Sequence, residues 1–132
     1  MTTDLATPHI PLGLSTEQAV AILQRFGIPL REESEREYCY RVETPLFSIA
    51  VYPEDGVIRS VLYDDPTGRE TDQGRLTKVN AYLNRYGSLT DWECRLDNGW
   101  MHYWFNPIAH AQMVYGLHND VIRFNPYREA NT

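Results

Sequence analysis

Asn98-Gly99 separates two strongly apolar segments, and this dipeptide most restricts how the chain can fold. Asn-Gly is the strongest short signal for a tight turn between antiparallel strands. The segment DWECRLDNGWMHYWF (91–105) is therefore predicted to be a β-hairpin. Asp55-Gly56 gives a similar signal between apolar segments at about 46–52 and 57–63. A third hairpin is predicted in AQMVYGLHNDVIRF (111–124), turning at Asn119-Asp120.

The two C-terminal hairpins end in the same tripeptide, Phe105-Asn106-Pro107 and Phe124-Asn125-Pro126. The turns of the two hairpins do not superpose when the tripeptides are aligned. We therefore interpret the shared tripeptide as similar strand-ending chemistry rather than as an internal repeat.

Two segments have the 3.6-residue apolar period of amphipathic helices. The first begins after Ser15, which can form a capping box with Gln18, and ends at Gly27. The second is predicted at about 72–86, with Gly74 weakening its first turn. Their apolar stripes are Ala19, Ile22, Leu23 and Phe26, and then Leu76, Val79, Leu83 and Tyr86.

A further strand is predicted at about 37–43, so the expected order is αβββαββββ. A chain of 132 residues can bury one substantial core. The sequence predicts a two-layer α+β fold, in which two helices cover one face of an antiparallel sheet. We expect a flexible leader at 1–13, a single domain at 14–127 and a tail at 128–132.

Turn lengths predict which side chains share a face of the sheet. With a two-residue Asn98-Gly99 loop, one apolar face contains Trp92, Cys94, Leu96, Met101, Tyr103 and Phe105. The same reasoning places Leu117 opposite Ile122 and Tyr115 opposite Phe124. It also assigns Phe47, Ile49, Val51, Ile58 and Leu62 to the core, with Val61 and Tyr63 on the opposite face.

The opposite face mixes aromatic and charged residues, a composition that protein interfaces favour. Its candidate binding residues are Tyr52, Arg59, Tyr63, Glu93, Arg95, Trp100, His102, Trp104 and Arg123. Three interpretations are open at this point. The chain itself covers this face through its tail or the curl of the sheet, another protein covers it, or it forms a small-ligand pocket around Trp100, His102 and Trp104.

Charge and targeting signals narrow the class of partner. The net charge of −6 disfavours nonspecific nucleic-acid binding and an anionic membrane surface. The chain has no apolar run long enough to span a bilayer, and its N-terminus lacks the pattern of a secretory signal. We expect a cytoplasmic protein whose Cys39 and Cys94 are reduced.

Chemistry-bearing residues show no recognised catalytic or cofactor pattern. His102, His110 and His118 are eight residues apart, which is not a metal-ligand spacing. Asp55, Asp65 and Asp72 fit turns and a helix start, and Cys94 is predicted to face the core. We predict no catalytic residue, metal or cofactor.

The segment AILQRFGIPLREESEREYCYRVETPLFSIAVYPEDGVIRSVLYDDPTG places a helix ending in FGIPL before three strands, with a second helix following. In element order, size and acidity, residues 17–86 resemble the small type III secretion chaperones. That resemblance implies a dimeric protein that holds partly unfolded effectors against its surface. The C-terminal part departs from the family, which has fewer strands there and closes with a helix.

These features together predict a non-catalytic, cytoplasmic protein-binding module of the chaperone or adaptor kind, which we expect to be a homodimer. The alternative is a small-ligand-binding domain or an enzyme.

Overall fold

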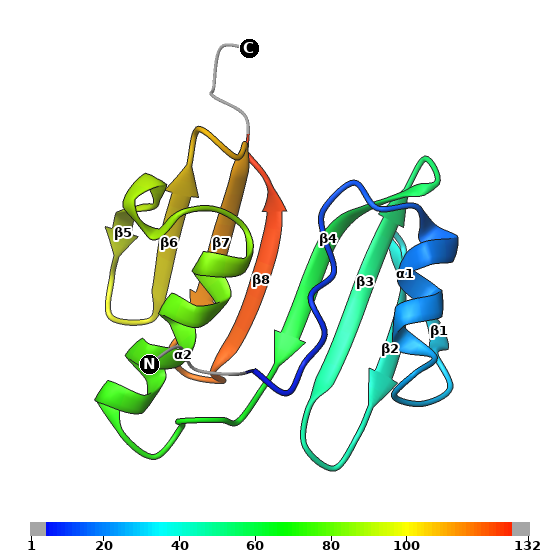
Figure 1. Cartoon of the computed structure of the whole chain (residues 1–132), viewed down its shortest axis with the longest axis horizontal. Helices are drawn as coiled ribbons and strands as arrows, with labels where there is room; N and C mark the ends of the chain where they lie inside the picture. The colour runs from blue at the N-terminus through cyan, green and yellow to red at the C-terminus, as the bar shows by residue number, and fades with distance from the viewer. Residues whose placement is uncertain (1–4, 128–132) are drawn as a thin grey trace.

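The computed structural model describes residues 5–127, which form two helices packed on one antiparallel sheet (Figure 1). Residues 1–4 and the predicted tail at 128–132 lie outside the described residues. In chain order the elements are α1 (Thr16–Leu23), β1 (Leu30–Glu33), β2 (Tyr38–Glu43), β3 (Ser48–Glu54), β4 (Val57–Asp64), α2 (Asp72–Arg85), the 3-10 helix η1 (Leu89–Asp91), β5 (Glu93–Asp97), β6 (Met101–Asn106), β7 (Ala111–Gly116) and β8 (Val121–Pro126).

The two-layer α+β prediction is confirmed, with one strand more in the first half than expected. The additional strand, β1, has the sequence LREE and is exposed throughout. It lacks the apolar alternation that identifies a strand, and it forms by pairing with β2 from Leu30↔Arg41 to Glu33↔Tyr38.

The strand order is β1-β2-β3-β4-β8-β7-β6-β5. From each edge, four strands follow one another in chain order toward the middle of the sheet, β1 to β4 from one edge and β5 to β8 from the other. Each half of the chain is one helix followed by four sequential antiparallel strands. We call residues 15–64 the N-terminal unit and residues 71–126 the C-terminal unit. Their last strands, β4 and β8, pair antiparallel through Leu62↔Arg123 and join the units in the middle of the sheet.

Equivalent hydrogen bonds start the two helices. Ser15 Oγ accepts from the backbone N–H of Gln18, and Thr71 Oγ1 accepts from that of Gly74. Both caps satisfy an N–H that has no partner within its helix. The cap that the sequence predicts at Ser15 is thus confirmed.

The N-terminal segment packs between the two helices, although residues 1–13 were expected to form a flexible leader (Figure 1). Ile10 is fully buried, and its carbonyl accepts from Tyr86 Oη at 2.6 Å. Tyr63 Oη accepts from the Ile10 N–H at 3.3 Å and lies 2.7 Å from Tyr86 Oη. These contacts tie residues 5–13 to both the sheet and α2.

A bulge makes the face assignment in β4 wrong. The Asp55-Gly56 turn forms as predicted, because Glu54 pairs with Val57. The register then shifts between Tyr52 and Pro53, and one extra residue enters β4. An inserted residue reverses which face the following side chains occupy. Val61 and Tyr63 are consequently buried beneath the helices. Leu62, opposite Arg123, lies on the other face.

The predicted core face of β6 is also wrong. Trp104 pairs with Met113 and packs against the buried core, whereas Tyr103 pairs with Val114 on the opposite face. The sequence predicted the reverse, with Met101, Tyr103 and Phe105 inside. Both faces of β6 carry apolar side chains, so its own pattern could not decide which one α2 covers.

The two C-terminal turns and the edge strand β5 also differ from the prediction. Asp97 pairs with His102 and Gly116 with Val121, so four residues rather than two separate the last paired residues of each hairpin. Tyr115 and Phe124 are buried as expected, but opposite Ile122 and Met113. At the edge of the sheet, Leu96 and Cys94 are exposed rather than in the core, since only β6 flanks β5.

Candidate functional site

The structure separates the nine predicted binding residues into five places. Tyr52, Arg59 and Arg123 line one depression on the sheet face that points away from the helices, and Trp100 lines a second depression there. His102 and Trp104 lie on the opposite face, beneath α2. Glu93 and Arg95 lie on the edge strand β5. Tyr63 is fully buried in the core and is not available to a ligand.

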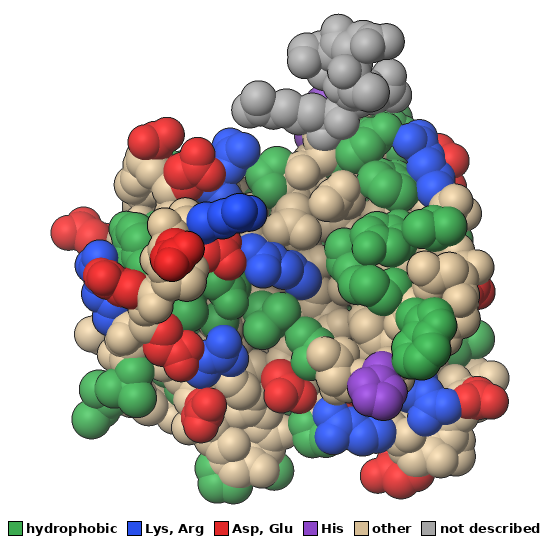
Figure 2. All heavy atoms as spheres, turned by 180° about the vertical axis from the view of Figure 1, so that it is seen from behind, with side chains coloured by type: hydrophobic (Ala, Val, Ile, Leu, Met, Phe, Trp, Pro, Cys, Tyr) green, Lys and Arg blue, Asp and Glu red, His purple; other side chains and the backbone are tan. Residues whose placement is uncertain are grey.

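The face away from the helices has two distinct halves. Figure 2 looks directly onto it and shows charged side chains of both signs over the N-terminal unit, on the left. Hydrophobic side chains gather over the C-terminal unit, on the right. Within residues 5–127, neither helix covers this face (Figures 1 and 2). We call it the open face.

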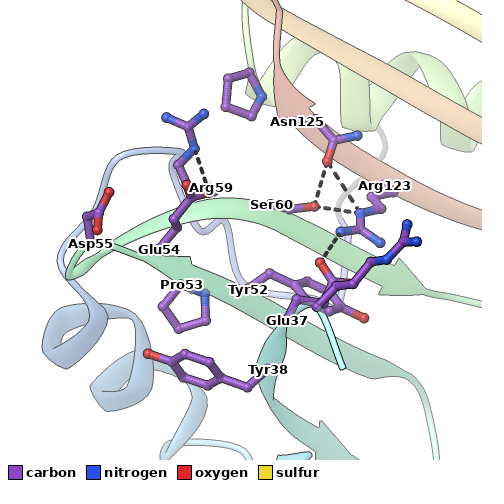
Figure 3. Close-up of a pocket in the computed structure, with 12 residues that line it drawn as sticks. Glu37, Tyr38, Tyr52, Pro53, Glu54, Asp55, Arg59, Ser60, Arg123 and Asn125 are labelled. Carbon is purple, nitrogen blue, oxygen red and sulfur yellow. Dashed lines mark hydrogen bonds and ion pairs between the residues drawn. The ribbon is translucent and has the colours of Figure 1, made fainter. Parts of the chain in front are cut away.

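The first depression, the polar basin, has a volume of about 490 Å³ and lies where the two units join (Figure 3). Strands β3, β4 and β8 form its floor, and the β1–β2 turn forms one side. Its lining residues are Arg36, Glu37, Tyr38, Tyr52, Pro53, Glu54, Asp55, Arg59, Ser60, Arg123, Asn125 and Pro126.

Ser60 is at the centre of the basin and joins the two units through hydrogen bonds. Its hydroxyl donates to Asn125 Oδ1 at 2.7 Å and accepts from Arg123 Nε at 2.6 Å (Figure 3). Arg123 Nε also lies 3.3 Å from Asn125 Oδ1. Because Ser60 comes from β4 and the other two residues from β8, this cluster spans the junction between the units.

The guanidinium of Arg123 is held from two further directions. It lies 4.3 Å from the centre of the Tyr52 ring, and Nη2 lies 3.3 Å from Glu37 Oε2. A cation over a tyrosine ring is stabilised by the electrons of the ring face. Burial raises the pKa of Tyr52, so its hydroxyl stays protonated at neutral pH.

Neither potential nucleophile near the basin is activated. The Ser60 hydroxyl is bonded to an amide oxygen and a guanidinium, and neither group can act as a base toward it. Cys39 is buried beside Arg41 and Glu32, and burial raises the pKa of its thiol. A thiol with a raised pKa is a poor nucleophile.

The second depression, the apolar hollow, has a volume of about 430 Å³ and adjoins the basin at Arg123, which lines both. Trp100 is 68% exposed at its rim, with its ring 6.2 Å from that of His118. The other lining residues come from β4, β6, and β7 and β8 with the turn between them: Leu62, Met101, Val114, Gly116, Asn119 and Val121.

Arg95 forms a third, smaller cluster at the edge of the open face. Its guanidinium lies 4.9 Å from the centre of the Phe105 ring, and Nη1 donates to Tyr127 Oη at 2.6 Å. Glu93 lies beside it, 3.5 Å from Arg95 Nε. These contacts stabilise β5 against β6 and give Arg95 a structural role.

Sequence reasoning missed the residues that connect the basin, namely Ser60, Asn125 and Glu37. Asn125 belongs to the repeated Phe-Asn-Pro tripeptide, which was the one available signal. Ser60 had no signal, because its importance depends on the pairing of β4 with β8 across more than sixty residues.

The residues described, 5–127, contain no group of three or more His, Cys, Asp or Glu side chains placed to hold a metal ion. Over the same range, no helix combines the length and apolar character needed to cross a bilayer. The predictions of no metal and no cofactor stay predictions.

No protein-family model, curated protein or solved structure matches this chain.

Proposed function

We propose that this protein is a non-catalytic, cytoplasmic protein-binding module of the chaperone or adaptor kind. Its open face would hold an extended segment of a partner polypeptide. The observation that carries the proposal is the continuity of the polar basin and the apolar hollow through Arg123. A segment lying across both depressions would meet apolar and charged groups in succession.

The apolar hollow supplies the component expected of a protein interface. Exposed apolar patches on soluble domains mark interaction sites, and tryptophan is among the residues that contribute most to binding. Trp100 is the most exposed aromatic side chain at the hollow, and Met101 beside it can adapt its shape. Apolar side chains of the partner would therefore occupy the hollow.

The polar basin suits the charged and backbone groups of such a segment. Two of its cations are already paired, Arg123 with Glu37 and Arg59 with Glu54 at 3.6 Å. A partner can exchange these surface pairs at low cost, because exposed ion pairs contribute little. The unactivated states of Ser60 and Cys39 support a role in binding rather than in catalysis.

A homodimer is the second part of the proposal. The resemblance of residues 17–86 to type III secretion chaperones is compatible with it, since those proteins are dimers. The cytoplasmic location and the homodimer both stay predictions.

Selection of binding peptides tests the proposal. A random peptide library displayed on phage is panned against the wild-type protein, and selected peptides are synthesised and titrated. We expect them to carry clustered apolar residues, to shift the Trp100 emission to shorter wavelength and to lose binding to Val114→Glu. Val114 is half-buried on the open face, at the edge of the hollow.

Leu46→Ala is the matched control, because Leu46 is 67% exposed in the β2–β3 turn, outside both depressions. It should bind the selected peptides like wild type. Peptides that bind Val114→Glu and wild type equally would contradict the proposal. Sedimentation velocity tests the homodimer separately, and a monomer over the full accessible concentration range would remove that part.

A further inference from the structure

The ends of the two helices carry the same sequence pattern. Residues 21–27 are AILQRFG and residues 81–87 are AYLNRYG, so alanine, leucine, arginine and glycine recur at matching places. Both segments begin in the helix of their unit and run into the connection that follows it. Leu23 and Leu83 are both buried. The two units therefore share a sequence pattern as well as an order of elements.

The strands of the two units can be matched residue by residue. At the turn before the last strand, Glu54 pairs with Val57 in the N-terminal unit, and Gly116 pairs with Val121 in the C-terminal unit. The last strand then begins with Val-Ile-Arg in both units. Glu54 and Gly116 are thus equivalent, and the other positions of β3 and β7 follow by counting back from them.

This matching places a two-fold axis between β4 and β8. Three residues before the end of β3, Val51 pairs with Val61, and three residues before the end of β7, Met113 pairs with Phe124. Val61 and Phe124 are therefore equivalent, and they are also direct partners in the β4–β8 pairing. In a contact with two-fold symmetry, a residue on the axis meets its own equivalent. An axis perpendicular to the sheet thus relates the two units.

The polar basin and the apolar hollow lie at equivalent places on the two sides of this axis. Each is lined by the turn before the second strand of a unit, by the third strand, and by β4 and β8. The two turns match because Glu33↔Tyr38 and Asp97↔His102 both enclose four residues. Five equivalent pairs line the two depressions, with the basin residue given first: Arg36 and Trp100, Glu37 and Met101, Tyr52 and Val114, Glu54 and Gly116, Asn125 and Leu62.

The equivalent residues differ in one consistent way. Each basin residue carries a charge, an amide or a hydroxyl, whereas each hollow residue is hydrophobic or glycine. Figure 2 shows the same division over the two units. The open face is therefore repeated in its backbone and divided in its chemistry.

A two-fold axis reverses the direction of a chain that lies across it. A segment on the open face would meet the same arrangement of strands in either direction, so only side chains distinguish the two directions. β4 and β8 are each paired on both sides, and their backbone groups are not free to bind the segment as an added strand would be bound.

We infer that the open face binds partner segments that join an apolar part to a polar part in either chain order. Each segment lies in the direction that brings its apolar part onto the hollow and its polar part onto the basin. This inference rests on the proposed function and specifies its partners by their composition across the axis rather than by their chain direction.

Two synthetic peptides of the same composition test the inference. One has leucine and valine in its N-terminal half and serine and asparagine in its C-terminal half, and the other has these halves in the opposite order. Acetylated and amidated ends remove the terminal charges, which would otherwise differ between the two orders. We expect calorimetric dissociation constants within about threefold of each other.

A nitroxide at one end of each peptide reports its direction. Trp100→Phe assigns the indole N–H signal of Trp100 in a ¹⁵N–¹H correlation spectrum, and we expect stronger broadening of this signal when the nitroxide is on the apolar end of either peptide. Leu62→Asn gives the hollow the residue that Asn125 supplies in the basin, and it should weaken both peptides equally, by about fivefold. Leu46→Ala, outside both depressions, should bind both like wild type.

A difference of about tenfold or more between the two peptides would overturn the inference and leave the proposed function standing, since one order still binds. Equal broadening from both ends, or a Leu62→Asn variant that weakens only one peptide, would also overturn it. Failure of both peptides to bind would overturn the inference too, and the phage selection would then decide separately whether the proposed function fails with it.

Discussion

Lys78 Nζ lies 2.6 Å from Asp120 Oδ2, and both side chains are almost completely buried. The pair joins α2 to the β7–β8 turn. Lys78 also donates to the Asp65 carbonyl at 2.7 Å, and Asp120 accepts from Tyr115 Oη at 2.5 Å. Arg69 Nε, at 3.0 Å, is a further donor to Asp120. A lysine that a helical pattern would place on the surface thus belongs to the interior.

Removal of the charge on Asp120 should destabilise the protein strongly. Asp120→Asn keeps a side chain that tolerates the positive φ of 58° at this position, but it leaves the Lys78 ammonium buried without a carboxylate. We expect a loss of about 3 kcal/mol in the free energy of unfolding, measured by urea denaturation. Asp55→Asn is the control, because Asp55 has a similar φ of 54° in an exposed turn. A comparable loss in both variants would show that the ion pair is not the cause.

The same carboxylate should make stability depend on pH in the acid range. Burial acts to raise the pKa of Asp120, but the hydrogen bonds that it accepts, above all from Lys78, outweigh burial and lower it. A lowered folded-state pKa gives stability that is present above the unfolded value of about 3.9 and is lost as the pH falls through the folded value. The urea midpoint of the wild type should therefore fall more steeply below about pH 4 than that of Asp120→Asn. Parallel curves would contradict this.

Gly74→Ala should destabilise the protein, although helix propensity alone favours alanine by about 1 kcal/mol. A Cβ on Gly74 would lie 2.5 Å from the backbone oxygen of Gly68, which is too close. We expect a net loss of about 1–3 kcal/mol in thermal or urea unfolding. Asn84→Ala, at an exposed position of the same helix, should instead gain a few tenths of a kcal/mol. A stabilised Gly74→Ala variant would mean that the preceding turn can move away.

Tyr63→Phe should reduce stability without affecting ligand binding. The substitution removes the hydroxyl that accepts from the Ile10 N–H and pairs with Tyr86 Oη, and the expected loss is about 1–2 kcal/mol. Peptides selected against the open face should bind this variant like wild type, because Tyr63 lies in the core. Loss of peptide binding in a folded Tyr63→Phe protein would contradict this prediction and would show that Tyr63 contributes to the binding site.

Local signals predicted the elements well because caps and turns act over a few residues. Ser15 and Asp55-Gly56 do in the structure what their sequence context indicates. The strand β1 escaped prediction because its four residues are stabilised by their neighbour β2 rather than by an apolar pattern.

The faces of the strands were harder to predict because they depend on pairings between hairpins. The burial of Trp104 is fixed by its partner Met113 in the next hairpin, and the inversion of β4 follows from one bulge. Neither the pairing nor the bulge has a signal within a short window of sequence. The polar basin was missed for the same reason, since Ser60 and Asn125 meet only when the two units join.

The β4–β8 pairing that closes the middle of the sheet occurs within one polypeptide. If the two units were separate subunits, β4 and β8 would each be an unpaired edge strand. Fewer of the units would then be associated through the β4–β8 pairing when the protein is diluted. In this chain, the linker between the two units holds β4 and β8 near each other, at an effective concentration on the order of millimolar. The pairing of β4 with β8 therefore does not depend on the concentration of the protein. The eight-stranded sheet, and the basin across its centre, should therefore persist at any protein concentration in the cell.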